Sequence, residues 1–220
     1  MSGQDEVVEA HGTATTRDRL IETAVRLFGE RGVEATSLRA LTEAARTNIA
    51  AVNYHFGSKE GLLRTVINQT MELANRERGR RLDELEAGSG PPSVAALVRA
   101  FVEPGADLLE GRGPDVARFI GRMVSDPDPE VRQIFADQVD PVEGRYLTAL
   151  RRALPGLDDD GIRFAYTSML GLLSLHQSGA FEAVDWPQLS ESRAGGSGDA
   201  DRERLVGFIT GGILAALPAD

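Results

Sequence analysis

The sequence predicts an all-α protein in which a small N-terminal helix-turn-helix head is fused to a larger helical body. Apolar residues recur at helical spacing along most of the chain. Most such segments begin after Ser, Thr, Asn, Asp or Pro and end near Gly or Pro, as helices do. No stretch alternates convincingly between apolar and polar residues in the manner of a strand. We therefore expect a disordered arm over residues 1–14, the head over 15–63, and the body over 64–220.

The head is predicted to contain two short helices joined by a tight turn, with a longer helix on either side. The first helix is expected over residues 16–31, where Gly32 supplies its stop. The last is expected to run to about Leu85. Side chains that can cap a helix start precede all four: Thr15 or Thr16, Thr36 or Ser37, Asn48, and Ser58.

The body is predicted to hold further helices after a break at Gly88-Ser89-Gly90-Pro91-Pro92. Each is bounded by Gly, Pro or Asp, and Pro129 takes the first helical position, which proline favours. Pro104 is expected to kink the helix that contains it. The stretch 188–201 is rich in Gly and Ser and is predicted to be a mobile loop. The helices are expected over 93–110, 114–124, 129–154, 158–181 and 202–217.

The charge of the chain is unevenly distributed. The net charge is −10, which by itself argues against a nucleic-acid partner. The head, however, holds seven Lys and Arg against six Asp and Glu, so the acidic excess lies outside it. The chain has no cysteine, which excludes disulfides and thiolate metal sites and suits a reducing cytoplasm.

Several classes of protein are not indicated by the sequence. No apolar run approaches the ~20 residues of a membrane span, and residues 1–6 lack the features of a signal peptide. The three histidines do not have metal-binding spacing, and no nucleophile elbow, phosphate loop or dinucleotide fingerprint occurs in context. We therefore expect no enzyme activity, no metal, no cofactor and no membrane partner.

Residues 35–63 carry the functional prediction. The second short helix presents small and polar residues outward and a few apolar residues inward. A helix that lies in a DNA major groove while anchored to a small core needs this pattern.

The same region resembles the TetR family of bacterial regulators. The resemblance rests on Leu27-Phe28-Gly29-Glu30-Arg31-Gly32, on Ala35-Thr36-Ser37, and on the run from Ile49 to Leu63 that contains Asn53-Tyr54-His55-Phe56-Gly57-Ser58-Lys59. It implies a head that binds a double-stranded DNA operator, and a body that binds a small-molecule effector and forms a homodimer. It also implies a cytoplasmic repressor that ligand binding releases from a palindromic site.

Residues of the motif are expected to contact DNA in three groups. Thr36, Ser37 and Arg39 begin the second helix and would hold a phosphate or reach a base. The outward candidates on the recognition helix are Ile49, Ala50, Ala51 and Asn53, and Asn53 would bond an adenine edge or a phosphate. Asn48, at the start of that helix, is a further candidate for DNA contact. Tyr54, His55 and Lys59 are expected on the phosphate side. Capping is an alternative role for Thr36 and Asn48, and Ala50 and Ala51 could simply favour the helix.

The turn between the two short helices departs from the family pattern. Arg46-Thr47 stands where the family has Gly followed by an apolar residue. An arginine in the left-handed region is strained, so the turn either carries that strain or adopts another geometry. Arg46 could also add a phosphate contact.

Effector-binding residues are predicted on the body helices: Phe101, Phe119, Arg122, Met123, Phe135, Tyr146, Met169 and His176. For most of them, a place in the plain core is the alternative. His176 is the best candidate for a polar group inside a pocket. Arg118 and Arg122 would meet an anionic ligand, or else form a solvated pair with nearby acids. A looser resemblance to regulators of fatty-acid metabolism suggests an acyl-type or hydrophobic effector.

The last two helices are expected to form the dimer interface through Tyr166, Leu170, Leu173, Phe208, Ile209 and Ile213. An intramolecular core is the alternative reading of these side chains.

The alternative function is a helical small-molecule sensor or protein-interaction module without functional DNA binding. Arg46 and the acidic surface are the features that favour it.

Overall fold

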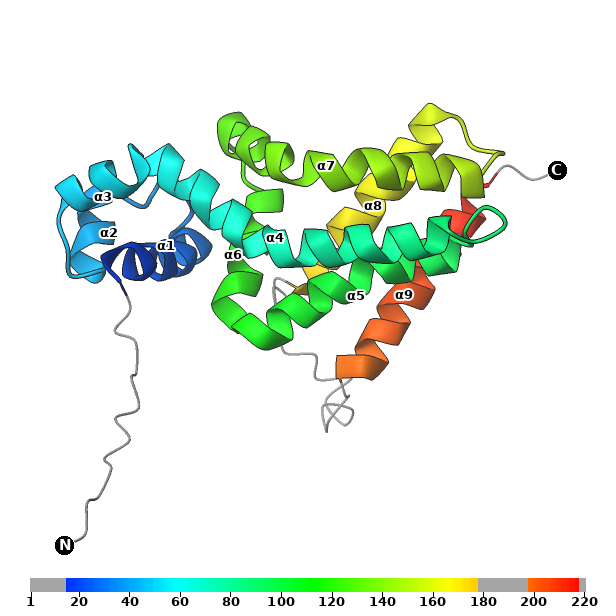
Figure 1. Cartoon of the computed structure of the whole chain (residues 1–220), viewed down its shortest axis with the longest axis horizontal. Helices are drawn as coiled ribbons and strands as arrows, with labels where there is room; N and C mark the ends of the chain where they lie inside the picture. The colour runs from blue at the N-terminus through cyan, green and yellow to red at the C-terminus, as the bar shows by residue number, and fades with distance from the viewer. Residues whose placement is uncertain (1–14, 178–197, 218–220) are drawn as a thin grey trace, which may run out of the picture.

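The computed structural model describes residues 15–177 and 198–217, and all regular secondary structure within these ranges is α-helical (Figure 1). This confirms the predicted fold class. The helices are α1 (Thr16–Arg31), α2 (Leu38–Ala44), α3 (Ile49–Phe56), α4 (Lys59–Glu86), α5 (Val94–Arg112), α6 (Pro114–Val124), α7 (Pro129–Ala153), α8 (Asp159–Gln177) and α9 (Gly198–Ala215). In Figure 1, α1 to α3 lie at one end of the molecule, and α4 runs from them into the larger helical body.

Most predicted helix boundaries agree with the structure to within two residues. The exception is α9, which begins at Gly198 although residues up to 201 were expected in a loop. Asp199 and Asp201 lie in its first turn, where the helix dipole favours negative charge, and this explains the earlier start. The predicted arm over 1–14, the rest of the predicted loop and the predicted end of α8 at Phe181 lie outside the described residues.

Side-chain caps fix the starts of the head helices. The Thr15 hydroxyl accepts from the amide of Asp18, whose carboxylate accepts in return from the Thr15 amide at 3.2 Å, which makes a capping box. Ser37, Asn48 and Ser58 each accept a hydrogen bond from the amide three residues later. Each cap satisfies one of the amides that a helix start leaves without a partner.

Two hydrophobic cores hold the described chain together. The first, here called the head-side core, includes Leu20, Phe28 and Val52 of the head together with Phe119 of α6 and Phe135 of α7. The core therefore does not divide at residue 63. A Cβ built on Gly29 of α1 would lie 3.1 Å from the backbone nitrogen of Phe119, so α1 and α6 pack almost backbone to backbone.

The second core, here called the body core, lies among α4, α5, α7, α8 and α9. Its large side chains include Phe101, Tyr146, Tyr166 and Met169. The rings of Tyr146 and Tyr166 meet the Phe101 ring edge to face, at centroid distances of 5.3 and 5.7 Å. The described helix α4 contributes residues to both cores and so connects them.

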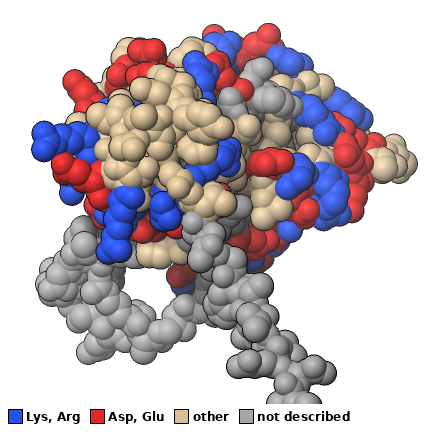
Figure 2. Space-filling view, turned by 60° about the vertical axis from the view of Figure 1, so that its left-hand side comes forward, with Lys and Arg blue, Asp and Glu red and all other residues tan. Residues whose placement is uncertain are grey.

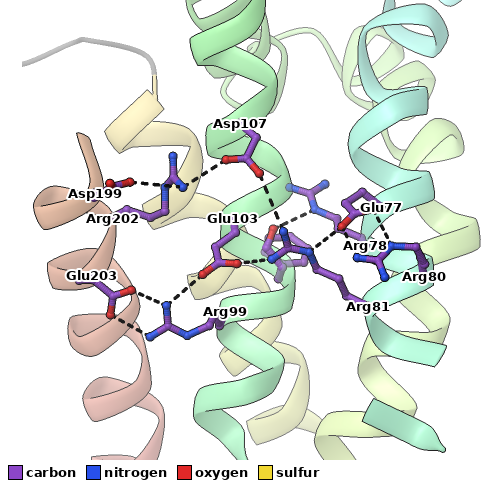
Figure 3. Close-up of polar contacts among 11 residues, drawn as sticks. Glu77, Arg78, Arg80, Arg81, Arg99, Glu103, Asp107, Asp199, Arg202 and Glu203 are labelled. Atoms are coloured by element: carbon purple, nitrogen blue, oxygen red, sulfur yellow. Dashed lines mark hydrogen bonds and ion pairs between the residues drawn. The ribbon is translucent and has the colours of Figure 1, made fainter. Parts of the chain in front are cut away.

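A network of ion pairs joins α4, α5 and α9 on the surface of the body (Figure 3). Arg81 of α4 and Arg99 of α5 both contact Glu103, and Arg99 also contacts Glu203 of α9 at 2.8 Å. Although partial burial opposes ionisation of Glu103, hydrogen bonds from Arg99 and Arg81 hold the pKa of that carboxyl below its usual value. The network ties α9 to the two helices beside it.

Candidate nucleic-acid interface

The recognition helix α3 is fixed from its inner side. Val52 is fully buried in the head-side core, and Ala51 and Phe56 pack partly against it. The guanidinium of Arg17 on α1 lies 5.6 Å from the centre of the Phe56 ring. These contacts determine which side of α3 is free to face a ligand.

The outward side of α3 is exposed, and this helix contains no Lys, Arg, Asp or Glu. Tyr54 is 85% and Ile49 45% exposed, and Ala50, Asn53 and His55 are also exposed. Figure 2, in which the head end comes forward, shows an uncharged area bordered by basic side chains, with acidic ones among them. A neutral surface of this kind can approach base edges while basic groups around it meet phosphates. Ala51 is only partly exposed, because its side chain packs against the head-side core.

The turn between α2 and α3 adopts the left-handed geometry, with φ of 52° at Arg46. The Thr47 amide donates to the carbonyl of Thr42 at 2.9 Å, and the Arg46 amide to that of Glu43 at 3.2 Å. This is the Schellman pattern, in which glycine is the usual residue at the left-handed position. Of the two possibilities that the sequence left open, the strained turn is therefore the one that the chain adopts.

Arg46→Gly is expected to stabilise the protein and to weaken its binding to DNA. Glycine removes about 1–2 kcal/mol of strain from the left-handed conformation. Part of this gain in stability is lost again, because glycine makes the unfolded chain more flexible. The exposed Arg46 side chain leaves with its positive charge, so the affinity for any DNA falls a few-fold at low salt. Urea unfolding and fluorescence anisotropy measure the two effects. A less stable variant would contradict the assignment of strain to this turn.

The start of α2 divides the predicted contacts into a buried and an exposed set. Thr36 is fully buried, and its hydroxyl donates to the carbonyl of Gly32 at 2.7 Å. The prediction that Thr36 contacts DNA is therefore wrong, because its hydroxyl joins the end of α1 to the start of α2. Ser37 is exposed and caps α2. Arg39 is exposed and pairs with Glu43 at 2.9 Å, and the hydrogen bond that it donates to the Glu43 carboxylate raises the pKa of Arg39.

The junction of α3 and α4 forms the other edge of the interface. Asn48 caps α3, so the capping role proposed for it is present. Lys59 begins α4 and is partly buried; desolvation lowers its pKa, although Glu60 and Glu34 oppose the shift. The Tyr54 and His55 rings meet edge to face at 4.9 Å on the exposed side of α3. A cation at a helix start next to an exposed neutral helix can receive a phosphate.

Lys59→Ala is expected to weaken binding to every DNA sequence and to reduce the salt slope by about one unit, as loss of one phosphate contact does. The matched control is Arg80→Ala, because Arg80 lies on the same helix but pairs with Glu77 and Glu84 of the body. Binding isotherms at several salt concentrations, with operator and unrelated DNA, measure the slope. A change in sequence preference alone would show that Lys59 does not bind phosphate.

None of the cavities described for residues 15–177 and 198–217 gathers the predicted effector residues around it. Six of them are buried in a core, which is the alternative role that the sequence analysis gave them. The body core holds Phe101, Tyr146 and Met169, and the head-side core holds Phe119, Met123 and Phe135. Of these six, Phe135 borders a small internal cavity described below.

The two polar effector candidates do not reach the interior. Arg122 is exposed and donates to the carbonyl of Glu30 on α1 at 3.4 Å, so it contacts the head. His176 is exposed on α8, while its neighbour Gln177 borders the internal cavity. Arg118 pairs with Asp115 at 3.0 Å and, like Arg122, borders an open hollow of about 810 Å³ between α6 and α8. His176 therefore does not lie inside a pocket of the described residues, whereas contact of Arg122 with an anionic ligand stays a prediction.

Most predicted dimer residues face inward. Tyr166, Leu173, Ile209 and Ile213 are buried in the body core of their own chain, and Leu170 packs partly against it. The four buried side chains therefore offer no surface to a second copy, and the intramolecular alternative describes them. Phe208 differs, because it is 70% exposed. The other large exposed apolar side chains on these two helices are Phe164, Leu175 and Leu214.

Arg78 is a polar residue of the interior that sequence reasoning missed. It lies within the charged run 76–81 and looks like part of a solvated face. The available signal is its register, because Met71, Ala74 and Leu82 continue a buried stripe of α4 through position 78.

No helix in residues 15–177 or 198–217 combines the length and apolar character needed to cross a membrane. The same residues contain no cluster of three or more side chains that could hold a metal ion.

Comparison with known proteins identifies both parts of the chain. Residues 20–66 match the model of bacterial regulatory proteins of the tetR family, and residues 99–212 match that of the tetracyclin repressor-like C-terminal domain. The probable HTH-type transcriptional regulator YttP of Bacillus subtilis is 36% identical over 124 residues, an alignment that spans 56% of each chain.

Two solved structures share the fold. SmeT, the repressor of the Stenotrophomonas maltophilia multidrug efflux pump SmeDEF, has a TM-score of 0.60 at 22% identity, covering 94% of this chain and 92% of that one. The transcriptional regulator FadR from Bacillus subtilis, solved in complex with stearoyl-CoA, has a TM-score of 0.57 at 16% identity, covering 88% of this chain and 97% of that one.

Proposed function

The chain belongs to the TetR family of bacterial regulatory proteins, and on that premise we propose that it is a repressor that binds a palindromic operator as a homodimer. The observation that carries the proposal is the exposed neutral side of α3. The opposite side of this helix packs into the head-side core, and Lys59 follows its C-terminal end at the start of α4. It is a regulator rather than an enzyme, and it acts in the cytoplasm, where the operator DNA is.

The outer sides of α8 and α9 support the homodimer. Phe164 and Leu175 of α8, and Phe208 and Leu214 of α9, are exposed, and the two helices contact each other. A Cβ built on Gly171, Gly207 or Gly211 would meet no atom within 4 Å, so another helix can approach these positions closely. A two-fold dimer places its two recognition helices in successive major grooves, about 34–36 Å apart.

We propose that a small molecule bound inside the body releases the DNA. The fold relative FadR was solved with stearoyl-CoA, which supports an acyl-type or otherwise hydrophobic effector. Helix α4 supports the coupling, because it begins at Lys59 in the interface and continues through both cores. A change in the body that shifts α4 therefore displaces the interface as well.

Selection of genomic fragments with purified protein at a stated salt concentration, read out by sequencing, tests the proposal. The expected result is enrichment of a palindrome with half-sites one helical turn apart. A second selection, after unfolding and refolding the protein to remove any co-purified effector, is the control. If neither selection enriches a site, the repressor proposal fails and the alternative, a helical sensor without DNA binding, takes its place.

A further inference from the structure

A buried arginine that has no acidic partner among the described residues lies in the interior of the body. Arg78 of α4 is 4% exposed. Its Nε donates to the carbonyl of Phe101 at 3.0 Å and its Nη1 to Oδ1 of Asn75 at 3.2 Å. The guanidinium also lies 4.2 Å from the centre of the Phe101 ring. These partners are all neutral.

The neighbouring arginines on α4 show what Arg78 lacks. Arg80 and Arg81 both pair with Glu77, and Arg81 also reaches Glu103 (Figure 3). Within the described part of the chain, no carboxylate lies within 4.0 Å of the Arg78 guanidinium. Burial lowers the pKa of Arg78, but an arginine in a protein keeps its charge. A buried charge is costly unless an opposite charge or several hydrogen bonds compensate it.

A small cavity adjoins this guanidinium at the seam between the two cores. Its volume is about 10 Å³, which is room for about one water molecule. Its polar wall consists of Arg78, Ser174 and Gln177, and the rest is apolar apart from the backbone of Gly105: Met71, Ala74, Ile120, Phe135, Leu170 and Leu173.

Two nitrogen atoms converge beside Gly105. A Cβ built on this glycine would lie 3.0 Å from Nη2 of Arg78 and 3.0 Å from Nε2 of Gln177. The Gln177 nitrogen is buried and makes no hydrogen bond within the described structure. The two nitrogens therefore pack against Gly105 and lie close to each other, so one carboxylate at the neighbouring cavity could accept from both.

We propose that Arg78 and Gln177 bind the carboxylate of the effector, which is an organic monoanion with an apolar body. This rests on the proposed function and specifies the class of its ligand. The carboxylate pairs with the charge of Arg78, and the apolar body lies against the side chains of α4, α6, α7 and α8 that line the cavity. Because the cavity now holds only about one water, the ligand separates these helices as it enters.

The position of the site explains how binding reaches the DNA. Arg78 and Lys59 are nineteen residues apart on the same helix, about 28 Å along its axis. Separating α4 from α6 and α8 around Arg78 therefore moves the end of α4 that begins in the interface. The ligand is bound by the state with separated helices and so favours release of DNA.

Isothermal titration calorimetry with octanoate and with octanamide tests the proposal on the protein without DNA. The two probes have the same chain length and differ in charge. The wild type is expected to bind octanoate at least about 10-fold more tightly than octanamide, and Arg78→Met is expected to lose this preference. Arg81→Met is the matched control, because Arg81 has acidic partners and does not line the cavity. It should keep the preference for octanoate.

Gln177→Glu provides a second variant that does not remove the arginine. A carboxylate at position 177 supplies the missing partner of Arg78 within the chain. The variant is expected to have a higher Tm than the wild type without ligand and to lose octanoate binding. In an operator-binding assay it should resemble the ligand-free wild type whether or not octanoate is present, because its carboxylate pairs with Arg78 without separating the helices. A lower Tm together with unchanged octanoate binding would overturn the role of Gln177.

Three results would overturn the assignment. Octanamide could bind as tightly as octanoate, Arg78→Met could leave the octanoate affinity unchanged, or sodium chloride could stabilise the protein as much as octanoate does. The last result would identify a site for a free inorganic anion without an apolar body. None of these results depends on operator DNA. A wild type that binds octanoate but enriches no palindrome would overturn the repressor proposal and leave the anion site in place.

Discussion

Gly61→Ala is expected to unfold the junction between α3 and α4 and to abolish operator binding. A Cβ at position 61 would lie 2.0 Å from the carbonyl oxygen of Phe56, well inside contact distance. This oxygen belongs to the last residue of the recognition helix, so the backbone itself must move. Because overpacking already costs about 1–3 kcal/mol when side chains can adjust, we expect a loss of at least about 3 kcal/mol here.

Gly79→Ala is the matched control for this prediction. Gly79 lies on the same helix, and the atom that an added Cβ would meet is Nη1 of Arg145 at 3.7 Å, an ordinary contact. Alanine favours a helix over glycine by about 1 kcal/mol, so this variant should be slightly more stable than the wild type. Urea unfolding followed by circular dichroism, with operator binding by anisotropy, compares the two. Equal stability of both variants would contradict the close approach at Gly61.

Phe208→Glu is expected to convert the proposed homodimer into a monomer and to weaken operator binding by about 100-fold or more. Phe208 is 70% exposed on α9, where it adds nothing to the core of its own chain. In a two-fold interface each substitution occurs twice, so two carboxylates are buried where two aromatic rings had packed. A monomer contacts one half-site, and the contacts of the other half-site are lost.

Leu73→Glu controls for the general effect of a new charge. Leu73 is 52% exposed on α4, on neither of the two proposed interface helices. Its replacement should leave both the mass in solution and the operator affinity close to those of the wild type. Light scattering coupled to gel filtration measures the mass. A dimeric Phe208→Glu variant with full operator affinity would show that the outer side of α9 is not the interface.

The helix starts and the recognition helix could be predicted from the sequence because both depend on local chemistry. Ser37, Asn48 and Ser58 cap their helices through amides three residues away, and Val52 is the apolar anchor that the pattern of α3 requires. Arg46 shows the same locality, since two backbone hydrogen bonds of the turn dictate its conformation.

The errors concern positions where tertiary packing decides between two sides of one helix. Tyr166 and Ile213 are apolar residues suited equally to a dimer surface and to a core, and α5 and α7 bury them in the core. Successive residues of a helix point in different directions, and at the end of α8 it is Gln177 that borders the cavity while its neighbour His176 is exposed. Arg78 differs from its charged neighbours in the sequence only by its register on the apolar stripe of α4, the side that α5 covers.

The packing of α6 on α1 has a consequence for any attempt to isolate the DNA-binding part. A fragment that ends at residue 63 would retain Phe28 and Val52 but lose Phe119 and Phe135, which complete the same core. Such a fragment would expose a large apolar surface and fold poorly. In the intact chain, amide hydrogen exchange should therefore show α1 and α6 opening together as one cooperative unit, although α2 to α5 lie between them in the sequence.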